Sequence, residues 1–166
     1  RVETLKMLDG LVDIYLPDLK YHSPRISALY SHAPDYFEKA AAAIAEMFRQ
    51  VGRPVLSPDS GLMKKGVIVR HLLLPGCAGD SKKVLRHLHD TYGNDIYVSI
   101  MNQYTPLEHL KQIPELAHSP LLRPVTEDEY ARVLDFADRI GIETGYMQEG
   151  GTAAESFIPA FNGEGL

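Results

Sequence analysis

The stretch from Gly66 to Gly76, GVIVRHLLLPG, restricts the fold more than any other part of the sequence. It is a run of β-branched and leucine residues that starts at a glycine and stops at a Pro-Gly pair. Apolar runs with such boundaries are typical of strands buried on both faces of a parallel sheet. The run also contains Arg70 and His71, and burial of a guanidinium is unfavourable unless an anion pairs with it. We therefore expect a parallel strand in which Arg70 meets either a structural carboxylate or a charged ligand.

Helices and strands alternate along the rest of the chain. Helical segments carry apolar residues at spacings of three and four and stop at glycine, whereas strand segments are short β-branched runs. The pattern predicts helices at 2–8, 34–51, 80–92 and 126–140, strands at 11–16, 66–76, 95–101 and 142–148, and irregular loops at 53–65 and 102–125. The expected N-caps are Asp80 or Ser81 for the third helix and Thr126 for the fourth, where Glu129 completes a capping box.

Strands that are joined by helices run parallel, so the sequence predicts a single α/β domain over residues 1–166. Four such strands fit either a partial (β/α) barrel of the TIM type or a small open sheet. The helix at the start implies that a strand came before it. The partial barrel, as the C-terminal part of a longer barrel, is therefore the favoured interpretation.

Polar side chains follow the predicted strands at their carboxyl ends, where ligands bind in barrels and open α/β sheets alike. They are Asp18 and Lys20, Arg70, Asn102 and Gln103, and Gln148 and Glu149. Carboxylates, cations and amides around one opening suit a zwitterionic ligand with hydroxyl groups. The alternative is that Asp18 and Lys20 are solvated turn residues and that Arg70 is paired internally, and both interpretations stay open at this point.

Composition excludes several classes of protein. The formal net charge of -5, without a basic run, gives no support for nucleic-acid binding. No apolar run approaches the roughly 18–20 residues of a membrane span, so no membrane partner is expected. Cys77 is the single cysteine, so an internal disulfide is excluded and a reducing, cytoplasmic location is favoured.

Histidine and cysteine give no clear catalytic or metal signal. The seven histidines show no ligand spacing, so no metal site is predicted. His71 should point to the face opposite Arg70, beneath a helix. Cys77 could be a nucleophile, but no base partner is recognisable, and a structural thiol is favoured.

Three segments resemble the later strands of radical SAM proteins: VDIYLPDLKY at 12–21, GVIVRHLLLPG at 66–76 and DIYVSIMNQYTP at 95–106. The likeness is to proteins similar to pyruvate formate-lyase activating enzyme, especially its uncharacterised iron–sulfur relatives. It implies a (β/α)6 partial barrel that holds a 4Fe–4S cluster and S-adenosylmethionine. In that family the reduced cluster cleaves S-adenosylmethionine to methionine and a 5′-deoxyadenosyl radical. Implied partners are a glycyl radical enzyme or another protein substrate, and an electron donor such as flavodoxin or ferredoxin.

The resemblance also implies roles for residues of this chain. Asp18 and Lys20 match a pair that contacts the nucleoside and methionine parts of the cofactor, and Arg70 matches a strand arginine that reaches the same ligand. Asn102 or Gln103 stands where the family often has a histidine. No catalytic side chain is assigned. The cluster motif C-x3-C-x2-C is absent, and one cysteine cannot hold a 4Fe–4S cluster, so the cluster ligands are expected upstream of Arg1 and this part alone should be inert.

Two other classes are alternatives. An aldolase-like lyase on a similar fold would use Lys20 as a Schiff base, although the nearby Asp18 argues against that role. A binding module without catalysis would use the proline-rich loop at 102–125, and an exposed apolar patch around that loop would favour it.

Overall fold

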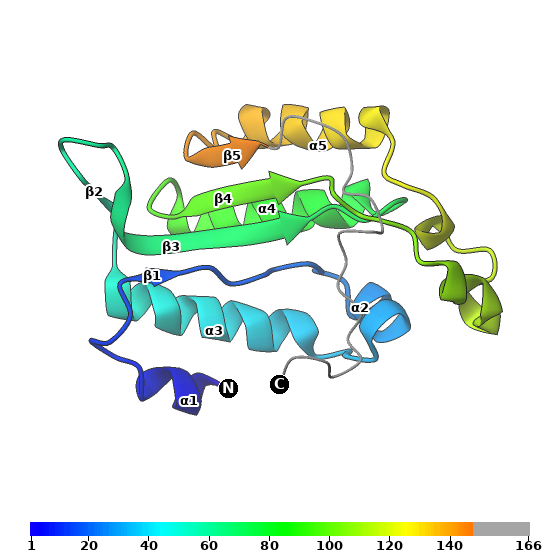
Figure 1. The fold of residues 1–166 in the computed structure, drawn as a ribbon, viewed down its shortest axis with the longest axis horizontal. Helices are drawn as coiled ribbons and strands as arrows, with labels where there is room; N and C mark the ends of the chain where they lie inside the picture. The colour runs from blue at the N-terminus through cyan, green and yellow to red at the C-terminus, as the bar shows by residue number, and fades with distance from the viewer. Residues whose placement is uncertain (148–166) are drawn as a thin grey trace, which may run out of the picture.

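The computed structural model describes residues 1–147. Its sheet has the strand order β1-β3-β4-β5, all parallel, with β2 added antiparallel to β3 (Figure 1). The strands are β1 (Ile14–Tyr15), β2 (Val55–Leu56), β3 (Met63–Leu72), β4 (Tyr97–Met101) and β5 (Gly145–Met147). The helices are α1 (Val2–Lys6), α2 (Pro24–Ser31), α3 (Tyr36–Val51), α4 (Ala78–Tyr92) and α5 (Glu127–Arg139), with 3-10 turns at Glu108–Gln112, Pro114–Leu116 and Pro120–Leu122. The fold is mixed α/β, as expected.

The long helices α3, α4 and α5 pack on one face of the sheet. Figure 1 shows α4 behind β3 and β4, with α3 and α5 along the two edges. One buried core joins these helices to alternate residues of the strands, which include Val67, Val69 and Ile100. Side chains at intervening positions, such as Arg70 and Ser99, point to the other side, because successive side chains of a strand alternate between faces. We call this second side of the sheet, which none of the helices α3, α4 and α5 covers, the helix-free face.

The prediction that the 66–76 strand is buried on both faces is wrong. On the helix side Val67, Val69 and His71 are 0% exposed, but on the helix-free face Ile68 and Leu72 are only half-buried and Arg70 is exposed. The physical reason is that, within residues 1–147, the helices that pack against the sheet do so on one face. The strand also begins earlier and ends earlier than predicted, at Met63 and Leu72.

Other boundaries are confirmed or shifted. The capping box of α5 is present as predicted, with the Thr126 hydroxyl accepting from the Glu129 N–H. The expected loop at 53–65 contains β2, which pairs antiparallel with the start of β3. Neither Asp80 nor Ser81 is the N-cap of α4, since this helix begins at Ala78. The predicted strand end at Gln148 and the segment from Glu149 onward lie outside the described residues.

Helix α2 has no counterpart in the sequence-based prediction, and Asp80 explains how it is held. The Asp80 carboxylate accepts the backbone N–H groups of His22 and Ser23, both at 2.9 Å. Ser23 is the N-cap residue of α2 but makes no side-chain capping bond of its own. A carboxylate from another helix therefore satisfies the free N–H groups at the start of α2.

A polar network attaches α1 to α3. The Glu46 carboxylate accepts bonds from Arg49 at 2.8 and 2.9 Å and from the Gln50 amide at 2.8 Å, while Gln50 also donates to the Leu5 carbonyl. Arg49 additionally pairs with Asp9 at 2.7 Å. Chiefly because Arg49 and then Gln50 donate to the carboxylate, the pKa of Glu46 falls from 4.5 to about 2.

Glu46→Gln should therefore remove a pH-dependent part of the stability. The folded-state pKa is lowered, so the contribution of Glu46 is fully present above about 4.5 and is lost as the pH falls through about 2. The melting temperatures of wild type and Glu46→Gln should differ most near neutral pH and converge across this acidic window. Thermal unfolding followed by circular dichroism checks this, and a difference that is constant with pH would contradict it.

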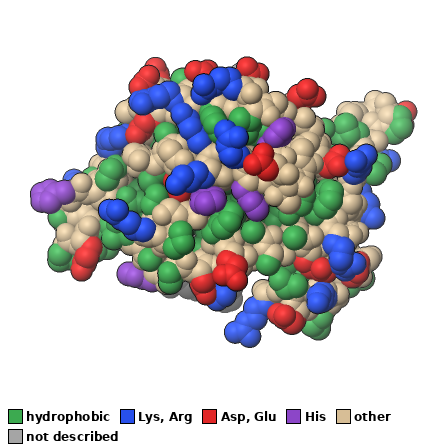
Figure 2. Space-filling view, turned by 180° about the vertical axis from the view of Figure 1, so that it is seen from behind, with side chains coloured by type: hydrophobic (Ala, Val, Ile, Leu, Met, Phe, Trp, Pro, Cys, Tyr) green, Lys and Arg blue, Asp and Glu red, His purple; other side chains and the backbone are tan. Residues whose placement is uncertain are grey.

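No helix within residues 1–147 has the length and apolar character needed to cross a membrane. Figure 2, which views the molecule from behind, shows Lys, Arg, Asp and Glu side chains interspersed over that face, with histidines near its centre. The Phe37 ring packs against the imidazole rings of His22 and His87, with centroid distances of 4.3 and 4.9 Å.

Candidate functional site

Three charged residues meet on the helix-free face at the carboxyl ends of two neighbouring strands. Asp18 forms a parallel bridge with Arg70, and Arg70 is in register with Ser99 of β4. Arg70 Nη2 lies 2.7 Å from Asp18 Oδ1, and Lys20 Nζ lies 3.3 Å from Asp18 Oδ2. We call Asp18, Lys20 and Arg70 the charged triad. The structure thus brings three of the five predicted binding residues into contact.

The triad is half-open to solvent. The exposed fractions of the side chains are 46% for Arg70, 39% for Lys20 and 32% for Asp18. The Arg70–Asp18 contact is an ion pair without hydrogen-bond alignment, since Asp18 Oδ1 accepts no hydrogen bond from any of residues 1–147. Asp18 is therefore the structural carboxylate that one interpretation required for Arg70. A guanidinium has five donors, however, so this pair leaves Arg70 able to bind a second anion.

Asn102 and Gln103 follow β4, at the next strand end. Asn102 Oδ1 is buried and has no hydrogen-bond partner among the described residues. Such an atom is costly to bury and is a natural acceptor for a ligand hydroxyl or amine. Gln103 is exposed, and its amide nitrogen lies 3.5 Å from Met101 Sδ. Neither side chain hydrogen-bonds to the charged triad within residues 1–147. Gln148 and Glu149 lie outside the described part of the chain.

His71 lies on the helix side, as predicted. Its Nδ1 is 2.7 Å from the Leu19 carbonyl oxygen, and its Nε2 has no hydrogen-bond partner in the described structure. Burial lowers the pKa of the imidazole, which favours the neutral form with the proton on Nδ1. His71 is thus a donor to the backbone of the segment that carries the triad.

Tyr36, the first residue of α3, contacts the same segment and is not among the predicted site residues. Its hydroxyl donates to the Asp18 carbonyl at 3.1 Å and accepts from the Lys20 N–H at 3.0 Å. The aromatic ring packs edge-on against Tyr21, with centroids 5.2 Å apart. Burial raises the pKa of the Tyr36 hydroxyl, so it stays protonated at neutral pH. No local sequence pattern signals this role, because a tyrosine at a helix start is unremarkable by itself.

Cys77 occupies the N-cap position of α4 and is buried among Tyr21, Leu74 and Leu121. Burial, with the nearby charges of Asp80 and Glu129, raises the pKa of its thiol from 9.0 to about 11. Because the thiolate is the reactive form, these surroundings suppress nucleophilic chemistry.

We accordingly expect Cys77 to react slowly with iodoacetamide in the folded protein at about pH 8 and rapidly after unfolding, because the raised pKa and the burial both disfavour attack. Mass spectrometry of the labelled protein over time measures both rates. Rapid stoichiometric labelling of the folded protein would contradict the assignment of Cys77 as a structural thiol.

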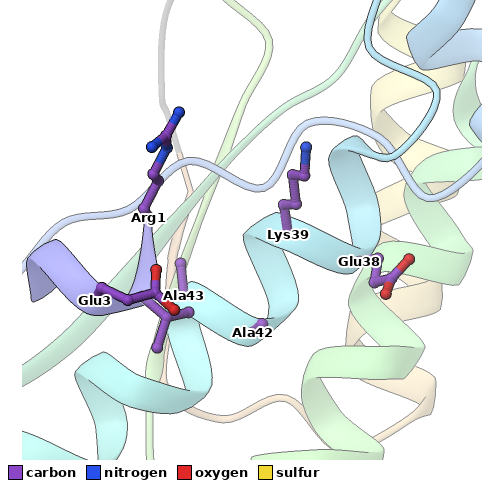
Figure 3. A pocket seen from close by; sticks show the side chains of 7 residues that line it. Arg1, Glu3, Glu38, Lys39, Ala42 and Ala43 are labelled. Atoms are coloured by element: carbon purple, nitrogen blue, oxygen red, sulfur yellow. The ribbon is translucent and has the colours of Figure 1, made fainter. Parts of the chain in front are cut away.

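Residues 1–147 contain no group of three or more His, Cys, Asp or Glu side chains arranged to hold a metal ion. Two hollows lie away from the triad. One, of about 420 Å³, lies between α1 and the first half of α3. It is lined by alanines and by Arg1, Glu3 and Lys39, which are labelled in Figure 3. Another, of about 720 Å³, lies between α2 and the loop at 102–125.

The geometry bears on the two alternative classes. A Schiff-base lysine needs an apolar pocket without an adjacent carboxylate, whereas Lys20 lies 3.3 Å from Asp18 and is 39% exposed. In the loop at 102–125, the leucine and isoleucine side chains are half-buried or buried. The exposed apolar patch that would favour a binding module is therefore not formed by this loop.

Comparison with known proteins identifies a distant relative. An uncharacterized protein of Methanocaldococcus jannaschii is 25% identical over 149 residues, which cover 87% of this chain and 37% of that protein. The chain thus spans little more than a third of the length of this relative. No protein-family model matches the chain, and no solved structure matches it. Function is therefore inferred from the residues at the strand ends.

Proposed function

We propose that the chain is the C-terminal part of a radical SAM protein and that the charged triad binds S-adenosylmethionine. The observation that carries this proposal is the meeting of Asp18, Lys20 and Arg70 on the helix-free face, at the carboxyl ends of β1 and β3. These residues lie in the DLK and RHLLLPG segments on which the resemblance rests, about fifty positions apart in the sequence. As part of the same proposal, the protein substrate is a glycyl radical enzyme, and a small redox protein supplies the electron.

The strand order supports the idea that the sheet is part of a (β/α) barrel. A doubly wound sheet reverses its strand order at a switch point and carries helices on both faces. Here β1, β3, β4 and β5 are neighbours in chain order, and the long helices pack on one face. In a barrel the helix-free face would become the interior, with the triad at its mouth.

The residues present fit the ligand. The methionine carboxylate of S-adenosylmethionine would pair with Lys20 and Arg70, since both cations have faces open to solvent. A ribose hydroxyl would donate to Asp18, and the unpartnered Oδ1 of Asn102 would accept from a further hydroxyl or amine. The bound cofactor supplies the sulfonium whose cleavage yields the radical. The 4Fe–4S cluster does not fit this chain, because the sequence contains one cysteine, so its ligands must come from elsewhere.

The proposal implies a region upstream of Arg1, and it is tested by determining that sequence and preparing the polypeptide that includes it. We expect a C-x3-C-x2-C motif there and, in an anaerobic preparation, a brown cluster. Incubation with dithionite and S-adenosylmethionine should then produce 5′-deoxyadenosine, detected by liquid chromatography. An upstream region without the motif, or a loaded cluster that releases no 5′-deoxyadenosine, would overturn the proposal.

A further inference from the structure

The backbone of Asp18, Leu19 and Lys20 is held from three directions where β1 leaves the sheet. On the β3 side, Arg70 N–H donates to the Pro17 carbonyl at 2.8 Å and the Leu19 N–H donates to the Arg70 carbonyl at 2.9 Å. Three further polar groups of this segment, the Asp18 carbonyl, the Leu19 carbonyl and the Lys20 N–H, bond the side chains of Tyr36 or His71 instead of another strand. Two side chains therefore do what a strand would do elsewhere in the sheet.

The Tyr36 hydroxyl imitates a residue of a neighbouring parallel strand. In a parallel ladder, one residue bonds the carbonyl before and the N–H after its partner. On one edge of the segment, the backbone of Arg70 bonds the Pro17 carbonyl and the Leu19 N–H, which flank its partner Asp18. On the other edge, the Tyr36 hydroxyl donates to the Asp18 carbonyl and accepts from the Lys20 N–H, which flank Leu19. A strand added at this edge must therefore stop before Leu19, and the end that carries Asp18 and Lys20 stays free for a ligand.

His71 supplies the third contact. Its Nδ1 lies 2.7 Å from the Leu19 carbonyl, and the Leu19 side chain is 0% exposed on the helix side. Because side chains of an extended segment alternate, anchoring Leu19 inward directs Asp18 and Lys20 outward. The buried position of Leu19 and the outward direction of Asp18 and Lys20 thus depend on each other.

We propose that Tyr36 and His71 are positioning residues that set the Asp18–Lys20 segment so that both charged side chains face Arg70 and a bound anion. The ligand in this inference rests on the proposed function, whereas the setting of the segment does not. Neither positioning residue touches the ligand.

Tyr36→Phe tests the hydroxyl, with Tyr15→Phe as its matched control. Tyr15 is a buried tyrosine whose hydroxyl donates to Gln50 at 2.6 Å, away from the triad. The expected results are that amide exchange of Lys20 accelerates by about tenfold in Tyr36→Phe and not in Tyr15→Phe, as the loss of one buried hydrogen bond implies. Affinity for S-adenosylmethionine should fall by about tenfold in Tyr36→Phe alone.

His71 is tested by two substitutions. Asparagine offers an amide N–H close to the place of Nδ1, whereas leucine offers none. Amide exchange of Lys20 should therefore be slower in His71→Asn than in His71→Leu. His71→Asn should also keep most of the affinity for S-adenosylmethionine that His71→Leu loses. If both variants bind the ligand equally, after correction for the folded fraction, His71 is a core residue only.

The outcomes separate the two claims. Unchanged Lys20 exchange in Tyr36→Phe overturns the positioning role, whatever the ligand. Faster exchange in Tyr36→Phe, together with a wild type that does not bind S-adenosylmethionine, supports positioning and overturns the proposed ligand. Equal losses of affinity in Tyr36→Phe and Tyr15→Phe would also contradict a specific role for Tyr36.

Discussion

Replacing Arg70 with glutamine is expected to weaken the binding of S-adenosylmethionine by about 10- to 100-fold, because a charge-assisted contact contributes roughly 1.5–3 kcal/mol. The free energy of unfolding should change by about 1 kcal/mol or less. The ion pair with Asp18 is half-exposed, and such pairs stabilise folded proteins only slightly. Arg70 would thus matter for a ligand far more than for the fold. Isothermal titration calorimetry and urea unfolding measure the two quantities.

Arg53→Gln is the control for this substitution. Arg53 pairs with Asp95 at 2.9 Å and is 80% exposed, and it lies just before β2, outside the charged triad. The Arg53→Gln substitution should leave both the affinity for S-adenosylmethionine and the free energy of unfolding nearly unchanged. If Arg70→Gln destabilised the fold by several kcal/mol or left the affinity intact, Arg70 would be a structural residue and the binding role would be wrong.

Replacing Glu129 with alanine should lower the free energy of unfolding by about 3 kcal/mol, because it breaks a network around a nearly buried carboxylate. Glu129 accepts from the Gly76 N–H at 2.8 Å, from Arg123 at 2.7 and 2.8 Å, and from the Thr126 N–H at 3.0 Å. Chiefly the bond from Arg123 holds the pKa of Glu129 well below its usual value. The network ties the turn after β3 to the start of α5, so its loss should loosen the strand-end region.

Glu108→Ala is the matched control, since Glu108 pairs with Lys111 at 2.7 Å but is 77% exposed. Its expected effect is about 0.5 kcal/mol or less. Chemical denaturation of wild type, Glu129→Ala and Glu108→Ala under identical conditions gives the three free energies of unfolding to compare. Similar losses in Glu129→Ala and Glu108→Ala would show that the carboxylate of Glu129 is not a structural anchor.

The regular elements were predictable because their signals are local. The α5 capping box depends on two residues three positions apart, and the buried face of α3 repeats at helical spacing. The meeting of Asp18, Lys20 and Arg70 was also foreseeable, since carboxyl ends of parallel strands share one edge of a sheet. These features need no knowledge of how distant segments pack.

Other features depend on distant partners and could not be seen in the sequence. Helix α2 is stabilised at its start by Asp80, which lies 57 and 58 positions away from the residues whose N–H groups it accepts. The role of Tyr36 depends on the path of the backbone after β1. The two-sided burial predicted for β3 was wrong because composition cannot tell whether a second layer covers a strand.

The most direct test of the charged triad as a binding site is an NMR titration of the isotope-labelled protein with S-adenosylmethionine. We expect saturable changes in amide signals at the strand ends, centred on Asp18, Lys20, Arg70 and Asn102. The signals of α1 and of Ala42 and Ala43, which line the hollow beside α1, should be unaffected. Saturating ligand that leaves the triad signals unmoved, or that shifts only signals from the hollow beside α1, would contradict it.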